Sequence, residues 1–164
     1  MNFILGNQSR MNLTQVHPDL VRVVEDTIKI SPIDFRVQEG VRTASRQKHL
    51  YDIGASTTLE SMHLIQADGF GHAVDLVPWV DFDHDGDSEL RWDWPLGYKI
   101  AEAVQRTAIL LAVGIRWGGC WDKLLNNIGD PEHASMDYIL RRRAESRRAF
   151  VDAPHFELYH RRKK

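Results

Sequence analysis

The sequence predicts an α+β protein in which a small antiparallel sheet is surrounded by helices. Two stretches, 18–30 and 94–112, repeat apolar residues at helical spacing. Several short segments alternate apolar and polar residues, as half-buried strands do. Helices and strands do not follow one another in the regular order that builds parallel sheets. The length of 164 residues fits one unit, so we expect residues 1–164 to form a single domain.

The first part of the chain is predicted to hold two helices and one strand. A helix is expected over 18–30, opened by proline and ended by a Ser-Pro pair. Residues 35–41 alternate as in a short strand. A second helix is expected over 43–53, because Gly54 supplies a helix stop. Residues 55–71 are interpreted as a loop.

The middle of the chain is predicted to form a strand and the longest helix. Residues 72–77 alternate as in a half-buried strand that ends at Pro78, and this period places Asp75 on a fixed element. After an acidic loop, Asp93 is suited to cap a helix whose apolar residues continue to Gly114.

The last part is predicted to contain two more strands and a basic helix. Residues 115–117 form a candidate strand before a Gly-Gly turn, and residues 135–149 form an arginine-rich candidate helix. A final strand is expected over 155–159, begun after Pro154.

Composition narrows the chemistry and the partners. Cys120 is the only cysteine, which excludes an internal disulfide or a multi-thiolate zinc site and favours a structural role for its thiol. Residues 1–13 lack the features of a secretory signal or membrane anchor, so we expect no integral membrane segment and a product that first accumulates in the cytosol. The net charge of −2 argues against a nucleic-acid partner, although residues 141–164 are basic. This basic end is either a solvated helix face or a surface for anionic polymers.

Histidines and carboxylates are therefore the available ligands for a catalytic metal. Zinc sites of this kind take three protein ligands and leave a fourth position for water. His63, His72, Asp75 and His155 are the candidates, and spacing alone does not choose between His63 and His72. There is no HExxH helix, so a zinc peptidase would have to assemble its ligands from separate strands and loops. A single histidine of this kind is more often a surface or hydrogen-bonded core residue.

Three segments carry a resemblance to a known family. They are SMH at 61–63, GHAVD at 71–75 and DAPHFE at 152–157. Together they resemble the SxHxxGxAxD and DxPHFE pattern of the D-alanyl-D-alanine carboxypeptidases and L-alanyl-D-glutamate endopeptidases, the VanY-like and phage endolysin group. The likeness extends over roughly residues 10–160 and is greatest to the phage endolysins.

The resemblance implies a ligand set and a catalytic base. Zinc would be held by His63, Asp75 and His155, and Asp152 would be the general base that activates water. Arg42 would steady the carbonyl oxygen or a substrate carboxylate, although a surface salt bridge is the alternative for this side chain.

Other residues are expected around this site. Gln47 and Trp117 complete the expected substrate-binding set, and Glu157 is either an acceptor that orients a ligand histidine or a plain strand residue. Residues 66–70 look like an insertion relative to the family spacing. This insertion puts the local shape of the substrate groove in doubt and leaves His72 as an alternative ligand to His63.

The acidic loop resembles an EF-hand calcium loop. Gly86 stands at position 6 and Trp92 at position 12, where a bidentate glutamate is usual. Positions 1, 3, 5, 7 and 9 offer side-chain oxygen atoms from Asp81, Asp83, Asp85, Asp87 and Glu89. We therefore expect either a weak calcium site or an acidic turn that caps the following helix.

The resemblance implies a zinc-dependent endopeptidase that cuts the L-alanyl-D-glutamate bond of bacterial peptidoglycan peptides. As an endolysin it would be made in the cytoplasm of an infected cell, reach the wall after release across the inner membrane, and act as a monomer. The alternatives are a D-alanyl-D-alanine carboxypeptidase, which would be expected to carry an export signal, and a zinc-stabilised cell-wall binding module without turnover.

Overall fold

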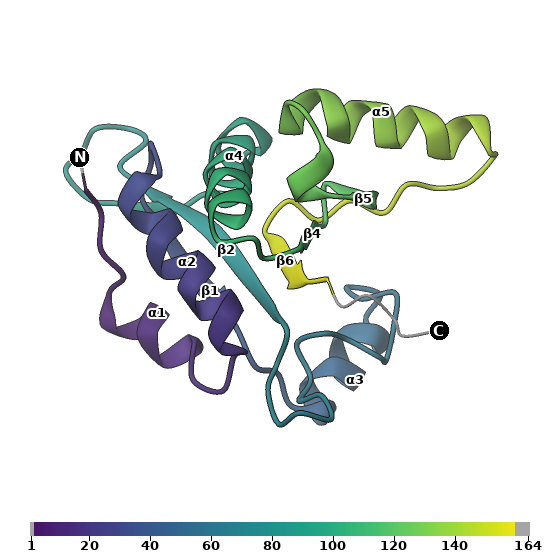
Figure 1. Cartoon of the computed structure of the whole chain (residues 1–164), viewed down its shortest axis with the longest axis horizontal. Coiled ribbons are helices and arrows are strands. Elements are labelled where there is room, and N and C mark those ends of the chain that lie inside the picture. The colour runs from purple at the N-terminus through teal and green to yellow at the C-terminus, as the bar shows by residue number, and fades with distance from the viewer. Residues whose placement is uncertain (1, 160–164) are drawn as a thin grey trace.

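The computed structural model describes residues 2–159 (Figure 1). The α-helices in this range are α1 Asn7–Asn12, α2 Pro18–Ile30, α3 Ala44–Asp52, α4 Trp94–Leu110 and α5 Pro131–Ala144, and a 3-10 helix, η1, covers Leu125–Asn127. The strands are β1 Phe35–Glu39, β2 Ala73–Val80, β3 Glu89–Leu90, β4 Ile115–Trp117, β5 Cys120–Leu124 and β6 His155–Leu158. None of the helices in residues 2–159 has both the length and the apolar composition needed to cross a membrane.

All strand pairs between these elements are antiparallel, in the order β1-β2-β6-β4-β5, and β3 pairs with the end of β2. The last strand in the sequence, β6, therefore lies between β2 and β4 in the middle of the sheet (Figure 1). The predicted α+β class with a small antiparallel sheet is confirmed.

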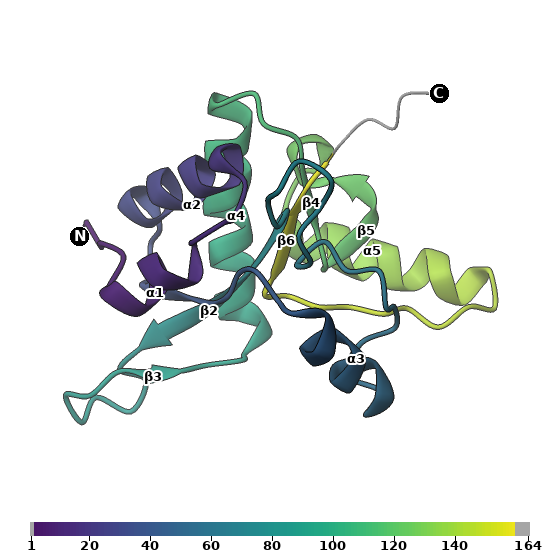
Figure 2. The ribbon, with the colours of Figure 1, turned by 90° about the horizontal axis from the view of Figure 1, so that it is seen from below.

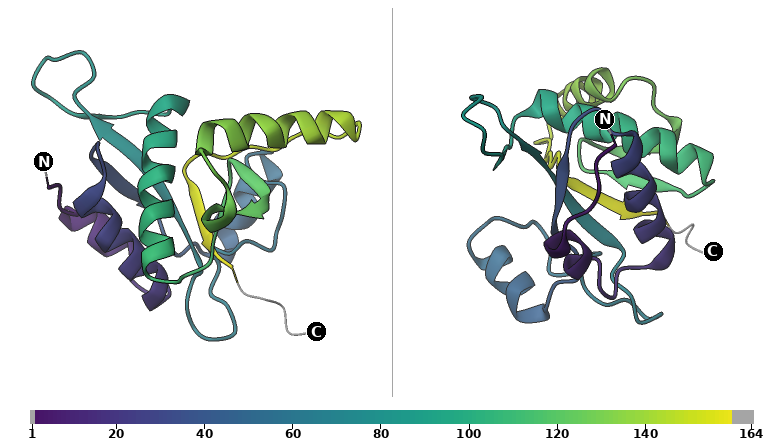
Figure 3. Two further views of the ribbon diagram at one scale, coloured as in Figure 1. Left: turned by 45° about the horizontal axis from the view of Figure 1, so that its top comes forward. Right: turned by 90° about the vertical axis from the view of Figure 1, so that its left-hand side faces the viewer.

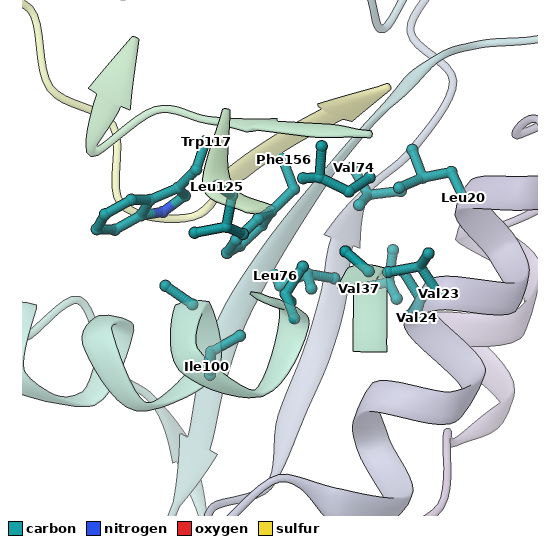
Figure 4. Packing of buried hydrophobic residues seen from close by; sticks show 14 of the residues in the cluster. Leu20, Val23, Val24, Val37, Val74, Leu76, Ile100, Trp117, Leu125 and Phe156 are labelled. Carbon is teal, nitrogen blue, oxygen red and sulfur yellow. The ribbon is translucent and has the colours of Figure 1, made fainter. Parts of the chain in front are cut away.

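The two faces of the sheet differ because side chains alternate along each strand. One face is apolar and packs against α2 and α4, which lie side by side across it (Figures 2 and 3). Val74 and Leu76 of β2 and Phe156 of β6 point into this core (Figure 4). The intervening residues Asp75 and His155 consequently lie on the opposite, polar face.

The predicted elements are largely confirmed, with three corrections of extent. The strand that begins at Ala73 continues through Pro78 to Val80, because the flanking bonds do not need a proline N–H: Trp79 N donates to Asp34 O and Arg91 N to Pro78 O. The basic helix α5 was predicted over 135–149 but spans Pro131–Ala144. It begins four residues early because an aspartate caps it, and it ends five residues early. The helix expected to continue towards Gly114 ends at Leu110.

Four elements were not predicted, one of which is the short 3-10 helix η1. Helix α1 has six residues, and β3 has only two. Strand β5 pairs with β4 across the predicted Gly-Gly turn, although its exposed residues do not alternate cleanly with buried ones. Each of these elements is held by its neighbours rather than by a pattern of its own.

Candidate active site

Three side chains meet at one point on the polar face of the sheet. Asp75 and His155 are direct partners in the β2–β6 ladder, and His63 reaches them from the loop before β2. His63 Nε2 lies 3.2 Å from Asp75 Oδ1 and 3.2 Å from His155 Nδ1, and His155 Nδ1 lies 3.3 Å from Asp75 Oδ1. The three atoms form a nearly equilateral triangle.

The outer nitrogen of each imidazole is already engaged. His63 Nδ1 lies 2.6 Å from the carbonyl oxygen of Gly40, and His155 Nε2 lies 3.0 Å from Glu157 Oε2. Both acceptors require the facing ring nitrogen to carry the hydrogen. The remaining lone pairs, on His63 Nε2 and His155 Nδ1, then point at each other and at Asp75. Such outer acceptors are usual for metal-bound histidines.

Three electron-rich atoms so close together require a cation between them. A tetrahedral zinc ion with bonds of about 2.0–2.1 Å holds its ligand atoms about 3.3 Å apart, which matches the triangle. When no metal ion is bound, a proton on the His155 ring can supply the positive charge. Burial acts to lower the pKa of His155, but hydrogen bonds to Asp75 and Glu157 outweigh it and raise the pKa to about 10. Burial likewise acts to raise the pKa of Asp75, yet the two imidazoles hold it far below its usual range.

The second oxygen of Asp75 faces Arg42. Arg42 Nη2 lies 3.5 Å from Asp75 Oδ2 and also pairs with Glu39, while its Nη1 donates to Gln47 Oε1 at 2.7 Å. A bulge in β1 between Val37 and Glu39 turns the Glu39 side chain to the polar face, opposite Asp75. Regular alternation from Val37 would instead place Glu39 in the core, so sequence periodicity could not reveal it.

Asp152 lies beside this cluster on the segment that leads into β6. Its backbone N–H donates to Gly118 O at 2.9 Å, and its side chain lines the same cleft as His63 and His155. Burial, followed by the negative charge of Asp75, raises the pKa of Asp152. The close approach depends on Gly118, where an added Cβ would lie 2.1 Å from Asp152 O.

The cleft above the cluster has a volume of about 740 Å³. Its wall includes three exposed or half-buried aromatic side chains, Trp92, Trp121 and Phe150, and the arginines Arg42, Arg46 and Arg116. Arg116 Nη1 donates to Glu157 Oε1 at 2.9 Å, so Glu157 connects Arg116 to His155. Sequence reasoning did not single out Arg116, and its place next to the Gly-Gly turn was the only available signal.

Two predicted substrate contacts lie outside this cleft wall. Gln47 is 1% exposed, and its amide nitrogen donates to Ser56 Oγ and Thr58 O. Trp117 is 0% exposed, and its Nε1 donates to Ala153 O. In this structure the two side chains support the walls of the cleft from behind and do not face its interior.

His72 does not join the triangle. Its side chain points away from Asp75, and its Nε2 lies 2.8 Å from Asp68 Oδ2. The structure therefore brings His63, and not the alternative His72, to Asp75 and His155.

The acidic loop gathers part of its predicted ligand set. Ligand oxygen atoms of Asp81, Asp83 and Asp85 lie within 4.8 Å of one another, and Gly86 N donates to Asp81 Oδ2 at 3.1 Å. Asp87 and Glu89 are not part of this group. Glu89 is the first residue of β3, with Oε1 3.4 Å from Arg91 Nη1. The loop extends beyond the end of the sheet (Figure 2).

Comparison with known proteins defines the class of this one as a peptidase. The chain is 31% identical to Serratia marcescens L-Ala D-Glu endopeptidase ChiX, whose crystal structure matches it with a TM-score of 0.67 over 96% of this chain and 91% of that one. It is also 26% identical to the L-alanyl-D-glutamate peptidase of Escherichia phage T5 over 162 residues, 96% of this chain and 99% of that protein.

Residues 1–159 match the family described as phage L-alanyl-D-glutamate peptidase, and the chain belongs to this family. The match spans the strands and loops that carry the triangle, the cleft and the acidic loop. The family resemblance of the three sequence segments is thereby confirmed.

Proposed function

We propose that this chain is a zinc-dependent endopeptidase that hydrolyses the L-alanyl-D-glutamate bond of bacterial cell-wall peptides. The observation that carries the proposal is the triangle of His63 Nε2, Asp75 Oδ1 and His155 Nδ1, with edges of 3.2–3.3 Å. Two imidazoles and one carboxylate are a usual ligand set for catalytic zinc. The names of the two relatives supply the substrate.

In this proposal Asp152 moves the proton. A bound zinc ion would lower the pKa of water to about 7 and polarise the scissile carbonyl. Asp152 accepts the proton of the attacking water and passes it to the leaving amine as the C–N bond breaks. Burial of Asp152 acts to raise the pKa of its carboxyl group, and a base whose pKa lies closer to the working pH returns the proton more readily.

Arg42 and Glu157 position the groups around the metal. Arg42 holds the outer oxygen of Asp75 and keeps a cation at the edge of the cleft, where it can also meet a substrate carboxylate or carbonyl oxygen. Glu157 fixes the orientation of the His155 ring.

Metal content and wall hydrolysis are the first pair of measurements. The wild type is expected to bind zinc and clear suspensions of cell walls, and His155→Ala is expected to lose both zinc at this site and lysis. Lysis that survives in a His155→Ala protein that has lost the zinc ion of this site would contradict the ligand assignment. Bound zinc without lysis by the wild type would favour a non-catalytic binding module.

Asp152→Asn tests the base separately from the metal. We expect turnover to fall by about 10²–10⁴-fold with zinc still bound, because general base catalysis contributes that much. Asp137→Asn is the matched control, since Asp137 is an exposed aspartate on α5. Unchanged turnover in Asp152→Asn would refute the assignment.

The bond that is cut is identified from the products of purified muropeptides. An endopeptidase of the proposed kind exposes a new amino group on D-glutamate. Release of terminal D-alanine with no new glutamate amine would instead favour a D-alanyl-D-alanine carboxypeptidase.

A calcium ion in the acidic loop is a second proposal, carried by the grouping of Asp81, Asp83 and Asp85. Gly86 has φ +100° and closes the loop on Asp81, as a calcium loop requires. We expect weak binding, because Trp92 occupies the position of the usual bidentate glutamate. Calorimetry with calcium, repeated on Asp83→Asn, tests this site, and no heat of binding in the wild type would exclude it.

The same proposal includes the place where the protein acts and its oligomeric state. We propose an endolysin that is made in the cytoplasm of an infected cell and acts on the wall as a monomer after release across the inner membrane. Fractionation of infected cells before and during lysis, with sizing of the purified protein, tests both points.

A further inference from the structure

A second group of potential metal ligands lies outside the cleft. His17 precedes α2, while Asp68 and His72 belong to the loop that leads into β2. His72 Nε2 lies 2.8 Å from Asp68 Oδ2, His17 Nε2 lies 3.9 Å from the same oxygen, and all three ligand atoms lie within 4.8 Å of one another. None of these side chains lines the cleft that holds the His63 cluster.

The loop presents Asp68 to the two imidazoles in a defined way. Phe70 N donates to Asp68 Oδ1 at 3.2 Å, which leaves Oδ2 directed at the histidines. Gly69 takes φ +85° in a turn in which its N–H donates to Gln66 O. The Phe70 ring then packs edge-on against His17, with centroids 5.7 Å apart.

We propose that His17, Asp68 and His72 form a second metal site, for zinc or a similar divalent ion that prefers imidazole. Two imidazoles and a carboxylate suit such ions. The present separations of 2.8 and 3.9 Å lie on either side of the value of about 3.3 Å that tetrahedral zinc requires. Asp68 is 42% exposed on the loop, so it is free to make this small adjustment.

His17 also has an acceptor ready for its other nitrogen. In this structure His17 Nδ1 accepts a hydrogen bond from Asp19 N at 3.2 Å and so caps α2. When Nε2 binds a metal, Nδ1 carries the hydrogen and needs an acceptor instead. Asp19 Oδ2 lies 3.8 Å from Nδ1, where it can take that hydrogen and orient the ring.

The site would be structural, because it joins the inserted segment to the start of α2. His17 N donates to Gly71 O at 2.9 Å, and His72 N donates to Met62 O at 2.7 Å, next to His63. A metal at the second site would therefore fix the end of the His63 loop that leads into β2. It would stabilise the folded chain without taking part in hydrolysis.

Zinc stoichiometry of the full chain tests the proposal. We expect two zinc ions per wild-type chain and one for Asp68→Asn, with wall hydrolysis retained. The substitution keeps the shape of the exposed side chain. The control is Asp52→Asn, an exposed aspartate paired with Lys48, which should still bind two ions. Equal zinc stoichiometry and affinity in the wild type and Asp68→Asn would overturn the second site.

A second measurement separates this site from the active site. His155→Ala should retain one zinc ion, and zinc should raise its Tm, whereas His155→Ala combined with Asp68→Asn should bind none. If His155→Ala does not fold, the shift in Tm with zinc is compared between wild type and Asp68→Asn, and an equal shift would contradict the proposal. If instead the proposed active-site zinc is wrong, Asp68→Asn will bind no zinc ion, because its one expected ion is the one at the active site.

Discussion

Replacing Glu157 by glutamine measures how strongly a neighbour of the His63–Asp75–His155 triangle affects its affinity for a metal ion. Glu157 is 6% exposed and serves two donors: Oε2 faces His155 Nε2 at 3.0 Å, and Oε1 accepts from Arg116 Nη1 at 2.9 Å. Glutamine has the same shape but only one acceptor oxygen, so it can serve only one of them. The other donor then faces an NH₂ group, and the negative charge is lost.

The size of the effect can be worked out in two ways. Loss of an outer partner of a metal-bound histidine typically weakens metal binding by about 10–100-fold, or about 1.4–2.7 kcal/mol. One hydrogen bond to a charged group contributes about 1.5–3 kcal/mol. For the zinc site that we propose, both routes predict that the zinc Kd of Glu157→Gln rises by one to two powers of ten.

Competition with a chromophoric zinc chelator at fixed pH measures this Kd. Glu102→Gln is the matched control, because Glu102 is a half-buried glutamate on α4 that pairs with Arg106 and lies outside the cleft. Urea unfolding of each variant confirms that the fold is retained. A Kd for Glu157→Gln within about threefold of wild type would lie below the range for outer-partner loss and refute the reasoning.

Four further outcomes follow from the structure. Phe156→Ala should lower the free energy of unfolding in urea by about 3–5 kcal/mol, because the ring is buried in the core. Gly118→Ala should lower turnover by a factor on the order of 100, since its Cβ would displace Asp152; wild-type turnover would contradict this. Burial, with a neighbouring carboxylate, raises the pKa of the Cys120 thiol to about 11, so a disulfide reagent at pH 8 should label it slowly until the chain unfolds. In chelator, the protonated His155 ring stabilises the fold fully below pH 6.5, and this stability should be lost as the pH rises to about 10, which urea unfolding at several pH values would show.

The sequence predicted most of the helices and strands, because in these segments the local pattern of apolar residues agrees with the tertiary structure. Alternation along 72–77 placed Asp75 opposite the core residues Val74 and Leu76. The family resemblance implied that His63 and His155 share one cluster, although 91 residues separate them in the chain, and the structure brings their side chains together.

The positions of some side chains could not be predicted from the sequence, because contacts between separate elements determine them. Glu39 reaches the polar face only through the bulge in β1. Gln47 and Trp117 have the composition of site residues, but packing places both in the interior. Asp68 lies in a loop without periodicity, so its approach to His17, 51 residues earlier in the chain, could not be predicted from spacing.

The place of β6 has a consequence for the making of the protein. Chains emerge from the ribosome N-terminus first, so β6 is the last of the described strands to appear. Until it inserts between β2 and β4, the sheet exists only as two unjoined ribbons, one with β1 and β2 and the other with β4 and β5. Because β6 also carries His155, a nascent chain that lacks it has no complete cluster. Hydrolytic activity is thereby postponed until translation has passed the final strand, and a premature stop codon before it would yield inert fragments.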